Sequence, residues 1–344
     1  MSVRVGINGF GRIGRNFLRA LLKLDSQGVD AGIELVAVND MVARDVSIHL
    51  LRYDSMHGRL ATAVEETAAG LRVGGREVAV LRELDPKALG WGDLGVDIVI
   101  ESTGRFTSRQ AAIAHVEAGA SRVIISAPSP DADATFVVGV NDQDFDPEHH
   151  VVVSNASCTT NCLVPMVKVV DDAFGLRQAM MTTVHAYTND QELLDLGRDN
   201  LRRSRAAAVN IVPASTGAAR ATSLVMASMK GRLDGHAFRV PVADGSITDL
   251  TAVVGTKTSV QEVNEAFRAS SSTGPLASVL VYNEDLIVSS DIVGEAASCI
   301  FDATLTMTIP LDDSSTLVKV VGWYDNEWGY SNRLIDLARV VGRS

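Results

Sequence analysis

The chain has 344 residues, which is enough for one very large domain or for two ordinary ones. Apolar residues make up 46% of it and charged residues 21%, as is usual for a globular protein with a full core. The formal net charge of −11 disfavours a general nucleic-acid binder, which needs a basic surface, so any anionic ligand has to be met by local positive charge.

The cysteines and the N-terminal residues indicate the compartment of the cell in which the protein is expected. Cys158, Cys162 and Cys299 are too few for a disulfide framework, and they suit a reducing compartment. Residues 1–10 enter a strand pattern at once and lack the charged and apolar regions of a signal peptide. Because no apolar run approaches the length of a membrane span, we expect a cytoplasmic protein with no membrane partner.

The first 150 residues alternate between strands and helices. Residues 3–7 form an apolar run, residues 11–24 place apolar side chains on one face of a helix, and residues 34–40 form a second strand. The predicted elements that follow are a strand at 96–102, a helix at 109–120, and strands at 122–126, 135–140 and 151–154. This alternation predicts a doubly wound parallel sheet of the α/β class.

The part of the chain after Cys158 has a different pattern. Its predicted strands lie at 180–188, 236–242, 247–255, 286–291, 304–309 and 317–324, and its predicted helices at 163–174, 260–271 and 331–342. Because few helices separate these strands, we expect a mixed or antiparallel sheet in an α+β domain. The boundary between the two domains is expected near Cys158.

The stretch NGFGRIG carries the spacing G-x-G-x-x-G in Gly9, Gly11 and Gly14. The spacing alone is weak, but here it follows a strand and opens a helix, which is the context of a dinucleotide-binding fingerprint. Glycine lets the backbone approach a pyrophosphate, and the helix N-terminus at Arg12 and Ile13 offers free N–H groups. A glycine-rich turn without a ligand is the alternative.

Asp40 ends the second strand, where a carboxylate accepts hydrogen bonds from the adenosine ribose. Its charge would repel a 2′-phosphate, so the pattern favours NAD over NADP. We therefore assign residues 1–157 and the C-terminal segment 325–344 to a Rossmann-type NAD-binding domain, and residues 158–324 to a catalytic domain.

Cys158 lies at a strand-to-helix junction among small polar residues, in SNASCTTNC. A helix N-terminus and a nearby imidazolium both lower a thiol pKa, and His185, at the end of a predicted strand, is the best candidate for the second. The alternative is a buried filler, which fits Cys162 and Cys299 better than it fits Cys158. Zinc is unlikely, because the spacing is C-x-x-x-C and no second pair exists.

Several motifs together resemble the phosphorylating glyceraldehyde-3-phosphate dehydrogenase family. They are GINGFGRIGRN (6–16), SNASCTTNC (154–162), HAYTND (185–190), PASTGAA (213–219), FRVP (238–241) and WYDNEWGYSNR (323–333). The resemblance implies that Cys158 attacks the aldehyde of glyceraldehyde 3-phosphate and that His185 takes the hydroxyl proton as hydride passes to NAD. Inorganic phosphate would then convert the thioester to 1,3-bisphosphoglycerate, a glycolytic step, in a homotetramer.

The same resemblance assigns the site residues one by one. For the cofactor it implies Gly9, Gly11, Arg12, Ile13, Asp40, Ser126, Asn326 and Tyr330, with Asn326 holding the nicotinamide amide. For the substrate and phosphate it implies Thr188, Arg203 and Arg239, and for the attacking phosphate Ser157, Thr159, Thr216 and Gly217. The alternative for Arg239 is a structural salt bridge. The arginine run 202–205 falls in a loop that packs near a neighbouring subunit's cofactor, rather than in a nucleic-acid surface.

Three positions depart from the family pattern. Gly197 replaces a proline common in NAD-using members, which weakens the exclusion of NADP, so some NADP use is expected. Leu84 replaces an arginine near the adenosine, and Arg82 is a candidate to take over its contact. Val164 replaces a common alanine in the helix after Cys158.

Two other functions are alternatives for this sequence. Erythrose-4-phosphate dehydrogenase is a relative with the same cysteine and histidine, but the intact STG at 215–217 and HAYTND favour the triose enzyme. A non-catalytic NAD-binding regulator is disfavoured, because Cys158 and His185 are both present.

Overall fold

The computed structural model describes residues 2–342, which form two compact units. Residues 2–157 and 330–342 make the first unit, and residues 158–329 make the second. The chain leaves the first unit between Ser157 and Cys158 and returns to it within the last helix. None of the helices in this described part combines the length and the apolar character that a bilayer span requires.

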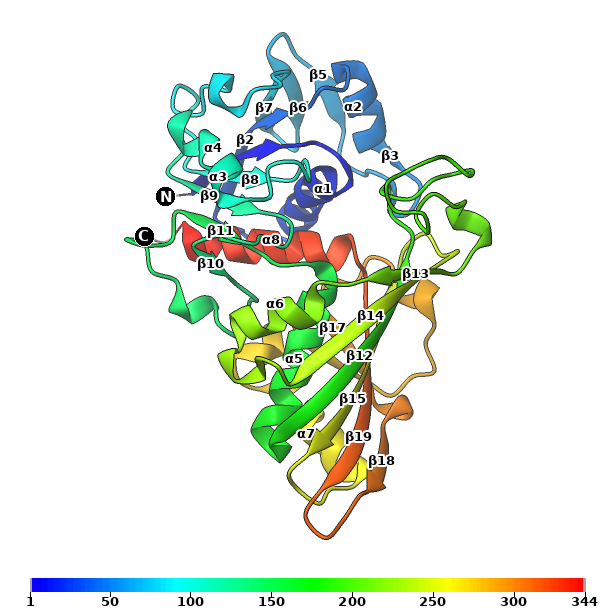
Figure 1. Ribbon diagram of the computed structural model, residues 1–344. Helices are drawn as coiled ribbons and strands as arrows, with labels where there is room; N and C mark the ends of the chain where they lie inside the picture. Colours follow the sequence, from blue (N-terminus) through cyan, green and yellow to red (C-terminus); the bar gives the residue numbers. More distant parts are fainter. Residues whose placement is uncertain (1, 343–344) are drawn as a thin grey trace. The chain divides into compact units, whose positions relative to one another are not determined.

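The first unit is built on a sheet in the order β10-β11-β9-β8-β1-β2-β7-β6-β5 (Figure 1). The strands are β1 (Val3–Asn8), β2 (Ile33–Asn39), β5 (Val64–Glu66), β6 (Gly70–Val73), β7 (Arg76–Leu81), β8 (Ile98–Glu101), β9 (Arg122–Ile125), β10 (Ala134–Thr135) and β11 (Val152–Ser154). All neighbours pair in parallel except at the β5–β6–β7 edge. Strand order reverses at β1, where ligands bind in doubly wound sheets.

The helices of the first unit bear out part of the sequence prediction. They are α1 (Arg12–Ser26), α2 (Arg44–Arg52), α3 (Arg109–Ala112), α4 (Ala114–Glu117) and α8 (Trp328–Val341), and a small pair of strands, β3 (Tyr53–Asp54) and β4 (Gly58–Arg59), completes the unit. The predicted helix at 11–24 is confirmed by α1, which buries Phe17, Leu18 and Leu21. The predicted helix at 109–120 is divided into α3 and α4.

The predicted strand at 135–140 is wrong beyond β10. The side chain of Asn141 accepts a hydrogen bond from the Val137 N–H and donates one to the Thr135 carbonyl, at 2.9 Å each. These bonds turn the chain back on itself, so the apolar residues after Thr135 are buried without joining the sheet. The apolar pattern of residues 135–140 predicted their burial correctly but predicted strand pairing that the structure does not have beyond β10.

The second unit holds a sheet in the order β13-β14-β12-β15-β19-β17-β16, with β18 beside β19. The strands are β12 (Leu176–Ala186), β13 (Val212–Ser215), β14 (Leu233–Val240), β15 (Ser246–Val254), β16 (Leu280–Asn283), β17 (Cys299–Asp302), β18 (Met307–Pro310) and β19 (Thr316–Tyr324). β12 is parallel to β14 and antiparallel to β15, which confirms the mixed sheet expected from the sequence.

Three helices accompany this sheet: α5 (Cys158–Phe174), α6 (Ala218–Val225) and α7 (Val260–Ser272). α5 packs against β12, β15, β17 and β19 (Figure 1). Short 3₁₀ turns fill the loops of both units: η1 (Pro86–Ala88), η2 (Asp142–Asp144), η3 (Ala207–Val209), η4 (Ala227–Met229), η5 (Pro275–Ser278), η6 (Ser289–Ile292) and η7 (Ala303–Leu305). The predicted strand at 286–291 is wrong, because the Asp291 carboxylate accepts the Val288 N–H at 2.8 Å and closes the turn η6.

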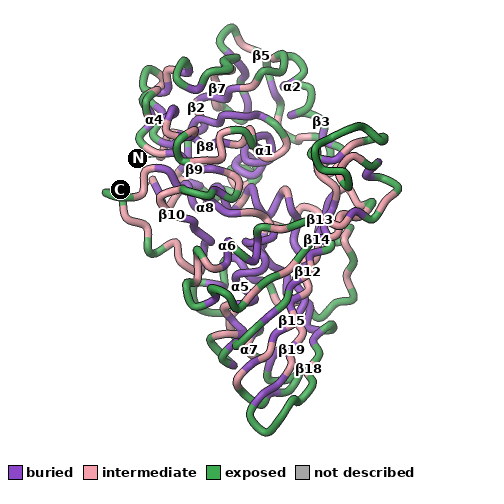
Figure 2. Tube along the Cα trace, in the orientation of Figure 1, coloured by how far each residue is buried: buried purple, intermediate pink, exposed green. Residues whose placement is uncertain are grey.

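Burial alternates along the long strands of the second unit. β15 is buried at every second residue, so one face of the sheet is covered and the other is open (Figure 2). Met180 on β12 points to the open face and is 68% exposed, whereas its neighbour Met181 is buried. The apolar side chains at alternate positions therefore form the core beneath α5.

Candidate active site

The turn that leads into Cys158 is strained. Ala156 has φ = 54°, a left-handed conformation that is unusual for any residue other than glycine. The Ser154 hydroxyl accepts the Ala156 N–H at 3.0 Å, and the Tyr330 hydroxyl donates to the Ala156 carbonyl at 2.9 Å. Such strain persists only where the surroundings hold it, and it is concentrated at functional sites. The turn sets Cys158 as the first residue of α5.

His185 is next to the last residue of β12, and it lies against Cys158. Its Nε2 is 3.4 Å from Cys158 Sγ, and its Nδ1 is 2.6 Å from the carbonyl oxygen of Ala186. The ring is 4% exposed and meets the edge of the Tyr324 ring at a centroid separation of 6.0 Å. The two residues that the sequence singled out are therefore in contact, at hydrogen-bond distance for a sulfur atom.

The electrostatics of this pair differ from the expectation. Burial raises the pKa of the Cys158 thiol, although the charge of Arg239 and hydrogen bonds from Thr159 act against it. Burial and the charge of Arg239 lower the pKa of His185 to about 3, so the imidazole is neutral at neutral pH. Burial and the charge of Arg239 therefore act against an imidazolium at His185, and the expected thiolate–imidazolium pair stays a prediction.

Arg239 is brought to His185 by the register of two parallel strands, because β14 pairs with β12 so that these two residues face each other. Arg239 Nη1 lies 2.9 Å from His185 Nδ1, donates to the Ala186 carbonyl at 2.9 Å and donates to the Thr188 hydroxyl at 3.1 Å. Both residues expected at the C3 phosphate, Thr188 and Arg239, therefore lie together beside the histidine. A guanidinium and a hydroxyl suit a phosphate.

Arg203, which the resemblance implies for substrate or phosphate binding, forms an ion pair with Asp190. Asp190 also accepts a hydrogen bond from the Thr188 hydroxyl. Two other arginines of this loop also pair with carboxylates: Arg205 with Asp195 at 2.9 Å, and Arg198 with Glu192. The charges of Arg203 and Arg205 in the run 202–205 are therefore balanced within their own loop.

The residues expected for the attacking phosphate fall in two places. Ser157 and Thr159 flank Cys158, while Thr216 and Gly217 lie at the N-terminus of α6, where the Thr216 hydroxyl accepts the Ala218 N–H at 3.2 Å. Thr159 is only 5% exposed, and its hydroxyl lies 2.9 Å from the Tyr324 hydroxyl.

In the first unit a cavity of about 250 Å³ opens at the carboxyl ends of β1, β2 and β8. Its lining residues are Asn8, Gly9, Gly11, Asn39, Asp40, Met41, Glu83, Leu84, Ser102, Thr103, Arg105 and Phe106. The sequence indicated Gly9, Gly11 and Asp40, and it noted Leu84 as a departure. The others were missed because they follow the ends of separate strands, and only the sheet order brings them together.

The glycines of the fingerprint have distinct roles here. Gly9 has φ = +97°, and a Cβ on Gly14 would come within 2.4 Å of the Gly9 carbonyl oxygen. A Cβ on Gly11 would meet nothing within 4 Å, so the backbone there is open to an approaching ligand. Gly11 is also the N-cap of α1 and offers no side chain to cap it. This open helix N-terminus fits a dinucleotide pyrophosphate.

Asp40 lines the cavity, whereas Arg12, the first residue of α1, is not among its lining residues. The Asp40 carboxylate accepts the Phe10 N–H at 2.7 Å and the Val42 N–H at 2.9 Å, so it anchors the glycine-rich turn while lining the cavity. The Arg12 guanidinium lies 2.5 Å from an oxygen of Asp54. Burial would raise the pKa of Asp54, but hydrogen bonds from backbone N–H groups and from Arg12 outweigh it and lower the pKa to about 2.

The remaining expected residues and the departures are placed as follows. Ser126 directly follows β9, and its N–H donates to the Glu101 carbonyl at 2.9 Å. Leu84 lines the cavity and is 64% exposed, whereas Arg82 donates to the carbonyl of Met41 at 3.1 Å. Gly197 is in an exposed loop of the second unit, and Val164 is fully buried in α5. Cys162 and Cys299 are buried and unpaired, as their filler role predicts.

A buried polar network beneath the cavity was not found from the sequence. Glu101 is 1% exposed and accepts hydrogen bonds from Asn8 at 2.6 Å, from His115 at 3.0 Å and from the Thr103 N–H at 2.8 Å. Trp91 Nε1 donates to His115 Nδ1 at 3.0 Å, so the proton of a neutral His115 is on Nε2, where it faces Glu101. The network therefore fixes two residues that line the cavity, Asn8 and Thr103.

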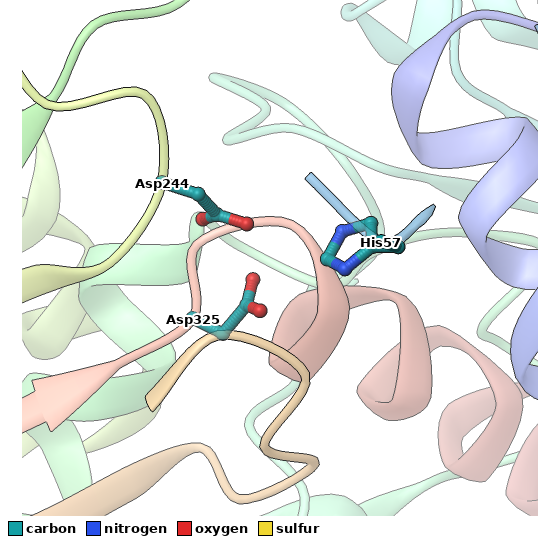
Figure 3. Close-up of side chains that lie close together, drawn as sticks. All are labelled: His57, Asp244 and Asp325. Carbon is teal, nitrogen blue, oxygen red and sulfur yellow. The ribbon is translucent and has the colours of Figure 1, made fainter. Parts of the chain in front are cut away.

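Asn326 sits beside a pair of buried carboxyl groups in the second unit. Its Oδ1 accepts a hydrogen bond from the Ser246 hydroxyl at 2.8 Å. The side chains of Asp244 and Asp325 point toward each other (Figure 3). Burial, together with the negative charges of Asp325 and Glu327, raises the pKa of Asp244 to about 8. The Asp244 carboxyl therefore favours its protonated form at neutral pH.

The doubly wound sheet with its open helix N-terminus defines the class of this protein, an NAD-dependent oxidoreductase. The model of the glyceraldehyde 3-phosphate dehydrogenase NAD binding domain matches residues 3–109, and that of the C-terminal domain matches residues 157–326. Glyceraldehyde-3-phosphate dehydrogenase of Streptomyces coelicolor is 54% identical over 342 residues, 99% of each chain. Glyceraldehyde-3-phosphate dehydrogenase 2 of Streptomyces arenae is 56% identical over 344 residues, and the Mycobacterium tuberculosis enzyme is 55% identical over 347 residues, each over all of both chains. The chain belongs to the glyceraldehyde-3-phosphate dehydrogenase family, and its cofactor is NAD.

Proposed function

We propose that this protein catalyses the phosphorylating oxidation of D-glyceraldehyde 3-phosphate, with NAD and inorganic phosphate, to 1,3-bisphosphoglycerate. The observation that carries the proposal is the contact of 3.4 Å between Cys158 Sγ and His185 Nε2. A thiol next to an imidazole is the arrangement of an activated cysteine nucleophile. Thr188 and Arg239, within hydrogen-bond distance of each other beside this pair, supply an anion site for the substrate's C3 phosphate.

In the proposed mechanism the Cys158 proton passes to His185 Nε2, and the sulfur attacks the aldehyde carbon. The Nε2 proton then passes to the aldehyde oxygen, which gives a thiohemiacetal and leaves His185 neutral again. His185 then acts as the base for the hydroxyl proton of that thiohemiacetal. Bound NAD supplies the hydride acceptor. Phosphate attacks the thioester that results, with Ser157, Thr159, Thr216 and Gly217 as its proposed contacts, and Cys158 leaves as the thiolate.

The proposed cofactor contacts in the first unit fall into three groups. Gly9, Gly11, Arg12 and Ile13 are proposed at the pyrophosphate, Asp40 at the ribose, and Ser126 and Tyr330 farther along the cofactor. Asn326, which belongs to the second unit, is proposed at the nicotinamide amide. Support for Tyr330 is indirect, because its hydroxyl holds the turn before Cys158. We also propose some NADP use, because Gly197 lacks the rigid ring that helps to exclude a 2′-phosphate.

A homotetramer and a cytoplasmic location are part of the proposal. Large apolar side chains are exposed on the open face of the second unit's sheet, namely Met180, Val184, Met307 and Ile309. Others are exposed in the loop after β12, namely Leu193, Leu194, Leu196 and Leu201. Exposed apolar surface of this extent favours burial by further copies of the chain. Light scattering should therefore give four times the mass of one chain. The cytoplasmic location is supported by the three unpaired cysteines, which suit a reducing compartment.

The test is the steady-state rate of NADH formation with glyceraldehyde 3-phosphate or erythrose 4-phosphate, each with and without phosphate. We expect the triose to be preferred and its sustained oxidation to require phosphate. Cys158→Ser should abolish turnover, while the matched control Cys162→Ser should retain it. Equal rates without phosphate, or turnover by Cys158→Ser, would contradict the proposal.

A further inference from the structure

Three strands of the second unit come together at Ser246, the first residue of β15. β15 runs antiparallel to both β12 and β19, so its start lies beside the ends of those two strands. Ala186 is the last residue of β12, and Tyr324, which pairs with Ser246, is the last residue of β19. Asn326 follows β19 by two residues. The topology therefore places Ser246 between Ala186 and Asn326.

The Ser246 hydroxyl is fully buried, and its hydrogen-bond partners are these two residues. Its oxygen accepts the Ala186 N–H at 3.1 Å and lies 2.8 Å from Asn326 Oδ1. A hydroxyl has one hydrogen atom to donate, and a backbone N–H only donates. The hydroxyl hydrogen of Ser246 is therefore left for Asn326.

This hydrogen atom assigns the orientation of the Asn326 amide. With Oδ1 toward Ser246, the hydroxyl hydrogen has an acceptor and both sides of the contact are satisfied. With the amide reversed, Nδ2 would donate to the hydroxyl oxygen, and the hydroxyl hydrogen would be buried without an acceptor. Because a buried donor without an acceptor is strongly unfavourable, Oδ1 faces Ser246.

The other end of the amide is held ready for a partner from outside the chain. Asn326 is only 5% exposed, and its Nδ2 forms no hydrogen bond within residues 2–342. An amide N–H₂ group donates and does not accept, so a carbonyl oxygen suits it. The carboxamide of nicotinamide carries such an oxygen, and Asn326 is the residue proposed at that carboxamide.

We propose that Ser246 is a positioning residue for the cofactor, which fixes Oδ1 of Asn326 inward so that Nδ2 donates to the carboxamide oxygen of NAD. Ser246 is 0% exposed, so it acts through Asn326 and not by touching the cofactor. Because Ala186 follows His185, the same hydroxyl ties Asn326 to the strand that carries the proposed base. The inference rests on the proposed function, which places the nicotinamide amide at Asn326.

The test measures cofactor binding by calorimetry and needs no turnover. NAD is compared with ADP-ribose, which lacks the nicotinamide and therefore cannot use Asn326. Ser246→Ala should raise the Kd for NAD about three- to tenfold, the range that the net contribution of one hydrogen bond gives, and should leave the Kd for ADP-ribose unchanged. Ser298→Ala is the matched control, because it removes a buried serine hydroxyl that has no hydrogen-bond partner within residues 2–342. Both dissociation constants should stay the same in this control.

Two further measurements show whether Ser246 acts through Asn326. In the Asn326→Ala protein, a second change Ser246→Ala should not raise the Kd for NAD again, because the residue through which it acts is absent. The analogue 3-acetylpyridine adenine dinucleotide keeps the carbonyl oxygen of NAD and lacks the amino group. Asn326→Ala should raise the Kd for this analogue and for NAD by the same factor, a comparison that holds even if Ser246→Ala does not fold.

The outcomes separate this inference from the proposed function. Equal losses of NAD and ADP-ribose affinity in Ser246→Ala, or a full effect of Ser246→Ala in the Asn326→Ala protein, would overturn the inference alone. The same holds if Asn326→Ala weakens NAD but not the acetylpyridine analogue, because Asn326 would then bind the amino group. An unchanged Kd for NAD in Asn326→Ala would instead remove the proposed nicotinamide contact.

Discussion

The buried carboxyl pair of the second unit makes a sharp prediction about stability. Asp244 is 3% exposed and points toward Asp325, and its Oδ1 accepts the Gly245 N–H at 2.8 Å (Figure 3). Replacing Asp244 by asparagine keeps that acceptor and adds an N–H₂ group that can donate to the Asp325 carboxylate. We predict that Asp244→Asn stabilises the protein, and that the gain grows as the pH rises.

The magnitude follows from the pKa of Asp244, which burial and the charge of Asp325 raise from 3.8 to about 8. Because the folded pKa is the higher one, this carboxyl contributes its full stability below pH 3.8 and loses it as the pH rises toward 8. At pH 7 the loss is at most about 4 kcal/mol, from roughly three pH units at about 1.4 kcal/mol each. A gain of about 2 kcal/mol, half of that upper bound, would raise the unfolding midpoint of a chain of this length by roughly 3 °C.

The assay is the thermal unfolding midpoint of both proteins at acidic, neutral and alkaline pH, followed by calorimetry. Asp313→Asn, at an exposed position, is the matched control for the aspartate-to-asparagine change itself. A lower midpoint for Asp244→Asn at every pH, or a gain that stays constant with pH, would refute the reasoning.

Three further changes probe the base and the cofactor cavity. His185→Asn removes the base at Nε2, so NADH formation in a single turnover, followed by stopped flow, should slow by about 10²-fold or more while NAD affinity stays unchanged. Asp40→Ala leaves the N–H groups of Phe10 and Val42 without their hydrogen-bond acceptor. The Kd for NAD, measured by calorimetry, should therefore rise about tenfold or more, and the Kd for NADP should rise less. Glu101→Gln places an N–H₂ donor next to groups that themselves donate to Glu101, which should lower the free energy of unfolding by about 1–3 kcal/mol. Its unfolding midpoint should fall and its Kd for NAD should rise, while the alkylation rate of Cys158 should not change.

The sequence predicted those features of the fold that local periodicity controls. The helix α1 was predicted because its apolar residues recur at helical spacing, and the long strands β12, β15 and β19 because apolar residues alternate. The turns after Thr135 and before Ile292 were missed, since side chains of Asn141 and Asp291 close them. A short polar side chain that bonds to the nearby backbone overrides an apolar run without altering its hydrophobicity.

The site was predictable where a residue's role follows from its place on an element. The sequence indicated Cys158 because it begins a helix and His185 because it lies near the end of a strand. The structure places the two side chains in contact. The low pKa of His185 was not foreseen, because it arises from burial and from the charge of Arg239, which is 54 positions away and is brought close by strand register. The Glu101–His115 network was missed for the same reason, as its members come from separate strands and a helix.

The proposed chemistry depends most on Cys158, whose Sγ is the atom that becomes acylated. The direct measurement is mass spectrometry of the protein quenched after mixing with glyceraldehyde 3-phosphate and NAD in the absence of phosphate. We predict one acyl group on the peptide that contains Cys158, lost when phosphate is added and not formed in Cys158→Ser. An acyl group on Cys162 or Cys299, or none on any cysteine during active NADH formation, would contradict the account.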